Sequence, residues 1–193
     1  MTDYNNRQDF EMGHWPELQG AFLDVVKLVQ SDKELKRQQK IELFTMASLS
    51  SGCQHCQSHG AFRLNSMGVD TARIRAIWEY ETSSLFSAGE RAALDLVRAA
   101  AQTPNATTPE HFAALREHYS NTQILEILAV SSLSAWLNRW NDTIATVTDQ
   151  ESVDWAEENL ADLGWHKGKH SGDASEQRKA HPVNTGWVEK EKQ

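Results

Sequence analysis

The sequence is poor in cysteine, in net positive charge and in long apolar runs, and each shortage excludes a class of protein. Its 193 residues include only two cysteines, whereas a secreted disulfide scaffold uses more cysteines at wider spacing. The formal net charge is -8, and such an acidic chain repels nucleic-acid phosphates. No apolar run approaches the roughly 20 residues that span a bilayer, and the polar N-terminus lacks the apolar core of a secretory signal. We therefore expect a cytoplasmic protein that binds neither nucleic acid nor membrane.

Alternating patterns typical of β-strands are also missing, and apolar residues recur instead at helical spacing. The sequence predicts an all-α fold. A single helical domain is expected over residues 17–163, after an N-terminal segment of residues 1–16. From residue 164 the composition shifts to Gly, Lys, His and Ser, so residues 164–193 are expected to form an extended arm or a disordered tail.

Local capping signals mark the expected ends of the helices. Pro16 suits the first turn of a helix that runs to about Gln30. Ser31 and Glu34 have capping-box spacing, which predicts that the next helix begins there. The same spacing recurs at Ser87. The longest helix is expected over about 122–147, where Asn141 and Asp142 could cap or cross-link neighbouring helices.

The two cysteines, Cys53 and Cys56, are three positions apart and directly follow Gly52. Residues at this spacing share one face of a helix, and the glycine lets the chain turn sharply before it. Unpaired amides at a helix N-terminus favour a thiolate over a thiol, and thiolate is the reactive form. The pattern therefore predicts one activated sulfur and a second sulfur that traps its oxidised product.

A zinc site is the main alternative for the same residues. Cys53, Cys56 and His59 could share a metal ion, but a closed zinc site needs four ligands. The remaining donors, His111 and His118, are distant and have no ligand-like spacing. We therefore predict neither a metal nor another cofactor.

Three further side chains are candidates for proton transfer. His59 lies one helical turn after Cys56 and could reach its thiol, and imidazole relays protons near neutral pH. His55 lies on another helical face, so it is either part of the relay or a solvated neighbour. Glu42 precedes the break before Cys53 and is either an acid that faces the dithiol or an ordinary solvated carboxylate.

The segment from Ser50 to Ala61, with the sequence SSGCQHCQSHGA, resembles the active-site segment of the AhpD-like alkylhydroperoxidase / carboxymuconolactone decarboxylase family. Other parts of the chain are similar to a bacterial branch of that family, namely residues 78–83, 86–94, 104–106, 137–143, 164–165 and 168–170. The resemblance covers roughly residues 20–170. It implies an all-helical fold, assembly into a symmetric homo-oligomer, and thiol-dependent reduction of peroxides.

By position, the resemblance implies that Glu42, Cys53, Cys56 and His59 form a proton-relay dithiol site, with His55 at the intervening histidine. Decarboxylase members generally lack the cysteine pair, so its presence favours the redox branch. Two spacings depart from the family pattern. His59 follows the second cysteine by three residues instead of four, and Glu42 precedes the first by eleven instead of twelve. Each one-residue shift turns a helical side chain by about 100°.

These observations lead to a mechanism in which Cys56, the thiol nearer His59, attacks the terminal oxygen of a hydroperoxide. Cys53 then resolves the sulfenic acid to a disulfide, which an external dithiol reductant reduces again. The helix-end argument alone would instead make Cys53 the more acidic thiol. Two alternatives remain. One is a non-catalytic metal or redox-sensing module that uses the same cysteines. The other is a lactone decarboxylase or another chemistry of the family in the same pocket, whose activity would survive loss of both cysteines.

Overall fold

The computed structural model describes residues 12–172, and every regular element in that range is helical. The prediction of an all-α fold is therefore confirmed. The α-helices are α2 (Pro16–Gln30), α3 (Arg37–Ser51), α4 (Gln54–Ser66), α5 (Thr71–Ala76), α6 (Ala88–Ala100), α7 (Pro109–Arg116), α8 (Asn121–Ile144) and α9 (Gln150–Leu160). Short 3₁₀ helices cover η1 (Ile77–Glu79), η2 (Ala161–Leu163) and η3 (Gly168–His170). Within the described range, no helix has both the length and the apolar character needed to cross a membrane.

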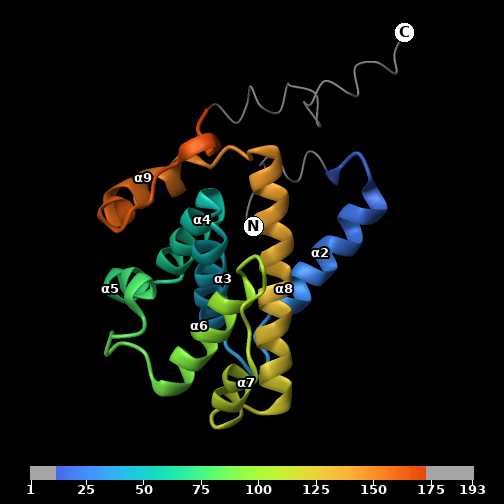
Figure 1. Ribbon diagram of the computed structural model, residues 1–193. Helices are drawn as coiled ribbons and strands as arrows, with labels where there is room; N and C mark the ends of the chain where they lie inside the picture. The colour runs from blue at the N-terminus through green and yellow to red at the C-terminus, as the bar shows by residue number, and fades with distance from the viewer. Residues whose placement is uncertain (1–11, 173–193) are drawn as a thin grey trace.

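Helix α3 lies at the centre of the bundle and packs against α4, α6 and α8 (Figure 1). Every residue from Lys40 to Ser48 is buried, so the helix is enclosed on all sides. Helix α2 lies against α8, and α9 lies across the end of the bundle beside α4. The dithiol segment is thus held between a central helix and the C-terminal elements.

Helix α4 approaches α3 closely because Gly60 has no side chain. A Cβ atom at Gly60 would lie 2.4 Å from the Thr45 Oγ1 atom and 3.2 Å from Phe44 Cδ1. Thr45 is fully buried and its hydroxyl donates to the Ile41 carbonyl oxygen at 2.8 Å, so it has little freedom to move. This contact sets how closely the middle of α4 packs against α3.

The predicted break before the cysteines is a sharp turn at Gly52, whose φ angle of 77° lies in the left-handed region that glycine adopts readily. Cys53 is the N-cap residue of α4, so the helix itself begins at Gln54. The helix ends at Ser66, and Gly68 follows with a φ angle of 80°. The prediction that a helix follows the turn at Gly52 is therefore confirmed, with Cys53 at its N-cap.

The expected helix start at Ser31 and Glu34 is wrong. Ser31 is the C-cap of α2, and the backbone N–H of Glu34 donates to the Glu126 carboxylate at 3.2 Å. Helix α3 begins only at Arg37, whose backbone N–H donates to Asp32 Oδ1 at 2.8 Å. The capping box at Ser87 is confirmed, with reciprocal bonds to Glu90.

The start of the predicted C-terminal arm packs on the dithiol helix. We use "C-terminal arm" for residues 164–172. Its Trp165 is 4% exposed and donates its indole N–H to the Gln54 carbonyl oxygen at 2.9 Å. His170 is also buried, and its carbonyl oxygen accepts the backbone N–H of Thr148 at 3.0 Å. The rest of the predicted tail, residues 173–193, and most of the predicted N-terminal segment, residues 1–11, lie outside the described residues.

Candidate functional site

The two thiols lie together at the N-terminus of α4. Cys53 and Cys56 are each 1% exposed, and both are free. The Cys53 sulfur accepts the backbone N–H of Cys56 at 3.4 Å. A hydrogen bond from the Cys56 thiol is the largest influence on Cys53 and lowers its pKa from 9.0 to about 6; burial opposes this change, and His170 adds to it. Near neutral pH, Cys53 is therefore mainly a thiolate.

Cys56 has the opposite tendency. Burial is the largest cause that raises its pKa well above 9.0, and the neighbouring Cys53 raises it further. The Asn141 side-chain amide donates to the Cys56 sulfur at 3.6 Å, which offsets part of that rise. The thiolate thus belongs on Cys53, whereas the sequence-based mechanism had Cys56 as the attacking sulfur. The difference arises because Cys53 caps the helix and Cys56 lies inside it.

His170 reaches the same thiols from the C-terminal arm. It is 1% exposed, and its Nδ1 atom lies 2.8 Å from the Thr146 carbonyl oxygen. Since a carbonyl oxygen can only accept, Nδ1 carries the hydrogen and Nε2 is unprotonated in the neutral ring. Burial alone would lower the pKa of His170, but Cys53, Thr146 and Asp142 together raise it above 6.5. His170 is therefore a protonatable group beside the Cys53 sulfur.

His55 is enclosed next to this group. Its Nδ1 atom lies 3.0 Å from the Thr148 hydroxyl oxygen, and its ring centroid lies 5.6 Å from that of His170. Burial is the main reason that the pKa of His55 falls well below 6.5, and the nearby His59 and His170 lower it further. His55 is therefore a buried neutral imidazole and not a solvated neighbour.

His59 does not hydrogen-bond to either sulfur among the described residues. Its Nε2 atom lies 3.0 Å from Asp149 Oδ2 at the start of α9, and its ring centroid lies 4.2 Å from that of His55. The prediction that His59 reaches the Cys56 thiol is therefore corrected. The three-residue spacing turns this side chain toward α9, where it ties two helices together.

The buried Glu42 side chain is bound in an ion-pair network that contains neither cysteine and whose other members, Arg73 and Glu90, are partly buried. Its two carboxylate oxygens accept from Arg73 at 2.7 and 2.9 Å, and Gln38 donates to the same group at 3.0 Å. Arg73 also pairs with Glu90 at 2.5 Å. The prediction that Glu42 faces the dithiol is therefore corrected, since its carboxylate joins α3 to α5 and α6.

Three polar residues near the thiols were not predicted from the sequence to belong to the site, namely Asn141, Asp142 and His170. Asn141 and Asp142 were expected only to cap or cross-link helices. Asn141 does so, since its Oδ1 atom accepts the Thr146 hydroxyl at 2.8 Å, while its amide reaches Cys56. His170 lay in the predicted tail. The available signal was the likeness of residues 168–170 to the bacterial branch of the family, in a stretch that otherwise looks unstructured.

A cavity of about 360 Å³ adjoins the thiol site, between the C-terminal ends of α3 and α6 and the second half of α8. Ser51, Asn138 and Asp142 are among its lining residues. Ser51 lies two positions before Cys53 in the chain. Asp142 Oδ1 lies 3.5 Å from His170 Nε2. Neither cysteine lines this cavity, and Asp142 connects it to the histidine beside the thiols.

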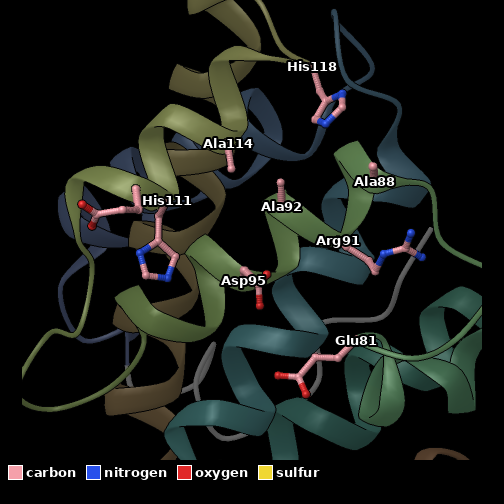
Figure 2. A pocket seen from close by; sticks show the side chains of 9 residues that line it. Glu81, Ala88, Arg91, Ala92, Asp95, His111, Ala114 and His118 are labelled. Atoms are coloured by element: carbon pink, nitrogen blue, oxygen red, sulfur yellow. The ribbon is translucent and has the colours of Figure 1, made fainter.

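A second cavity, of about 510 Å³, lies between α6 and α7 and includes both of the distant donors considered for zinc. Figure 2 shows His111 and His118 on its rim, above Asp95 and Glu81. Neither cysteine is among its lining residues. Within residues 12–172, no three His, Cys, Asp or Glu side chains are grouped so as to hold a metal ion. The described residues therefore bring no third or fourth zinc ligand together with the two cysteines.

Comparison with known proteins yields matches by structure only. No family model matches the chain, and no curated protein matches it by sequence. It is similar to the debrominase Bmp8, with a TM-score of 0.73 and 28% identity over 76% of this chain and 79% of that one. One of the two Bmp8 structures is a cysteine-to-alanine variant in complex with 2,3,4-tribromopyrrole, and the other is the apo protein.

Two further similar structures carry peroxidase-related descriptions. A protein of unknown function from Agrobacterium tumefaciens, proposed to be the antioxidant defence protein AhpD, has a TM-score of 0.60 and 24% identity over 68% of this chain and 90% of that one. An uncharacterized peroxidase-related protein from Ralstonia eutropha, described as an alkylhydroperoxidase AhpD core, has a TM-score of 0.65 and 19% identity over 73% and 75%. At these identities the likeness concerns the fold.

Proposed function

From the premise that this chain has the AhpD-like helical fold, we propose that it is a thiol-dependent peroxidase that reduces hydroperoxides through a dithiol–disulfide cycle. The observation that carries the proposal is the pair of sulfurs at the start of α4. Cys53, with its pKa lowered to about 6, supplies the nucleophile, and Cys56 lies beside it as a protonated thiol. Nucleophilic reactivity requires the thiolate form.

The first step is attack of the Cys53 thiolate on the terminal oxygen of a hydroperoxide. The S–O bond forms as the O–O bond breaks, and the alkoxide leaves and takes up a proton to become an alcohol. Cys53 is thereby oxidised to a sulfenic acid. The peroxide has gained the two electrons that the sulfur has lost.

The second step is attack of Cys56 on the oxidised Cys53 sulfur. The S–S bond forms as the S–O bond breaks, and the released hydroxide takes the Cys56 thiol proton to become water. An external dithiol then reduces the disulfide by thiol–disulfide exchange and is itself oxidised. Asn141, which donates to the Cys56 sulfur, would orient it toward Cys53.

The proposal is tested by thiol titration of the full chain before and after one equivalent of an organic hydroperoxide. We expect the loss of two thiols per chain, reversed by a dithiol reductant. Cys56→Ser should stop at a sulfenic acid that dimedone traps, and Cys53→Ser should consume little peroxide. Undiminished turnover in both variants would exclude the dithiol cycle and favour a cysteine-independent reaction such as lactone decarboxylation.

Reductive dehalogenation is a second candidate, favoured by the likeness to Bmp8 over three quarters of this chain. The Cys53 thiolate would take bromine from a protonated bromopyrrole, so that the S–Br bond forms as the C–Br bond breaks and the ring keeps the electron pair. Cys56 would then displace bromide and form the same disulfide. The net reaction exchanges ring bromine for hydrogen and oxidises two thiols. Bromide release from 2,3,4-tribromopyrrole, compared with hydroperoxide consumption, distinguishes the two substrates.

A further inference from the structure

We propose that His170 is the base that accepts the Cys53 proton, and that Asp142 positions its imidazole. The inference deepens the proposed dithiol chemistry, because it names the group that generates and stabilises the nucleophile. It also assigns this role to the C-terminal arm instead of the histidines next to the cysteines in the sequence.

The segment after α8 holds both the imidazole and the backbone of His170. Its Nδ1–H donates to the Thr146 carbonyl oxygen at 2.8 Å, and the His170 carbonyl oxygen accepts the Thr148 N–H at 3.0 Å. The ring is therefore fixed in the tautomer that leaves the Nε2 lone pair free. This arrangement orients an unprotonated nitrogen inside the protein without help from solvent.

The free Nε2 atom is buried and has no aligned hydrogen-bond partner among the described residues. Its neighbours are the Cys53 sulfur and the Asp142 carboxylate. The distance from Nε2 to Asp142 Oδ1 is 3.5 Å. An unpaired buried nitrogen is costly, but protonation would place the imidazolium between a thiolate and a carboxylate. In this step the Cys53 S–H bond breaks and the Nε2–H bond forms, with no change in oxidation state.

The other two histidines near the thiols are poorly suited to this role. His55 is directed at the Thr148 hydroxyl and is buried, which disfavours its charged form. His59 pairs with Asp149 toward the surface. His170 is the histidine that interacts with the sulfur that becomes the thiolate.

Several other titratable groups face His170 and must be considered in any test. Cys53 and His55 face it from α4, and Asp142 faces it from α8. Lys169, on the arm itself, pairs with the other Asp142 oxygen at 2.9 Å. Asp142 is therefore held in place from one side while its Oδ1 atom remains directed at the imidazole.

The first experiment measures the thiolate of Cys53 by its ultraviolet absorbance as a function of pH, in full-length protein carrying Cys56→Ser. The serine hydroxyl keeps a hydrogen-bond donor at that position. Adding His170→Gln should raise the apparent pKa of Cys53 by about one unit or more, since it removes the proton acceptor and the positive charge beside the thiolate. His166→Gln is the matched control, because His166 is an exposed histidine on the same arm and should leave the pKa unchanged.

A reciprocal measurement leaves His170 intact and decides the matter if His170→Gln fails to fold. Interacting groups must influence each other's titration, so the pKa of His170, followed by NMR, should fall in Cys53→Ser. It should also fall in Asp142→Asn. An unchanged thiolate pKa in folded His170→Gln, or an unchanged His170 pKa in Cys53→Ser, would overturn the proposal. Two thiols oxidised per hydroperoxide in that His170 variant would still support the dithiol cycle, so the two proposals fail separately.

Discussion

The Cys53 sulfur accepts the backbone N–H of Cys56 at 3.4 Å, so a cysteine side chain caps α4. A thiolate accepts hydrogen bonds better than a thiol, and the helix N-terminus favours negative charge. The N-terminus of α4 therefore stabilises the thiolate form of Cys53, which is its own capping residue. The same geometry keeps Cys56 one turn further in, where burial favours the neutral thiol.

We predict that the two cysteines differ strongly in alkylation rate even though both are equally buried. Cys56→Ser, which retains Cys53, should react with iodoacetamide with a midpoint near the Cys53 pKa of about 6. Cys53→Ser should react at least about tenfold more slowly near neutral pH, since its remaining thiol is mostly protonated. The rates are measured by mass spectrometry. They should converge in denaturant, and a faster reaction of the Cys53→Ser variant would contradict the assignment.

Glu42 is predicted to act on stability and not on the thiols. Arg73→Met would leave the buried Glu42 carboxylate without its cation, which should lower the free energy of unfolding by about 3–5 kcal/mol. Adding Glu42→Gln to that variant should restore part of the loss. Denaturant unfolding measures both effects, and the Cys53 pKa should stay unchanged in Glu42→Gln.

A surface ion pair provides the control for this prediction. Asp162→Asn removes the exposed partner of Arg75, whose own side chain is about one third exposed, and it should cost less than about 1 kcal/mol. Loss of peroxide turnover in a folded Glu42→Gln variant would count against the structural role and would restore Glu42 to the proton relay expected from the sequence.

Much of the fold was predictable because its signals are local. Helix positions followed from apolar spacing, and the box at Ser87 fixed the start of α6. The same signal failed at Ser31 because Glu126, far along the chain, binds the backbone where a helix was expected to begin. A capping pattern indicates which side-chain to backbone hydrogen bonds could form, but tertiary contacts determine whether they do form.

The same contrast between local signals and tertiary contacts applies to the candidate site. Cys53 and Cys56 are three residues apart, so their proximity follows from one helical turn. Glu42 was misplaced because an eleven-residue separation crosses a turn whose direction spacing alone does not define. His170 approaches from a segment that contains no helical periodicity, and its contacts with Thr146 and the thiols depend on how the C-terminal arm folds back.

His55 is predicted to make the protein less stable as the pH falls below 6.5. The unfolded chain takes up a proton near that pH, whereas burial keeps folded His55 neutral, so the unfolded state binds more protons. Its contribution to the slope is at most about 1.4 kcal/mol per pH unit. His170, with its raised pKa, acts in the opposite direction. His55→Gln should therefore lose less stability on acidification than the unmodified chain in thermal melts, and an equal or greater loss would contradict this role.

Gly60 provides a test of how α3 positions the dithiol helix. Gly60→Ala would place a methyl group 2.4 Å from Thr45 Oγ1, and overpacking of this kind costs about 1–3 kcal/mol of unfolding free energy. Thr45→Ala removes the clashing hydroxyl, so the double variant should be more stable than the sum of the two single changes predicts. A double-mutant cycle from denaturant unfolding measures this coupling. Because the clash is relieved only if α4 lies against α3 as described, strict additivity would mean that the two helices do not meet at these residues.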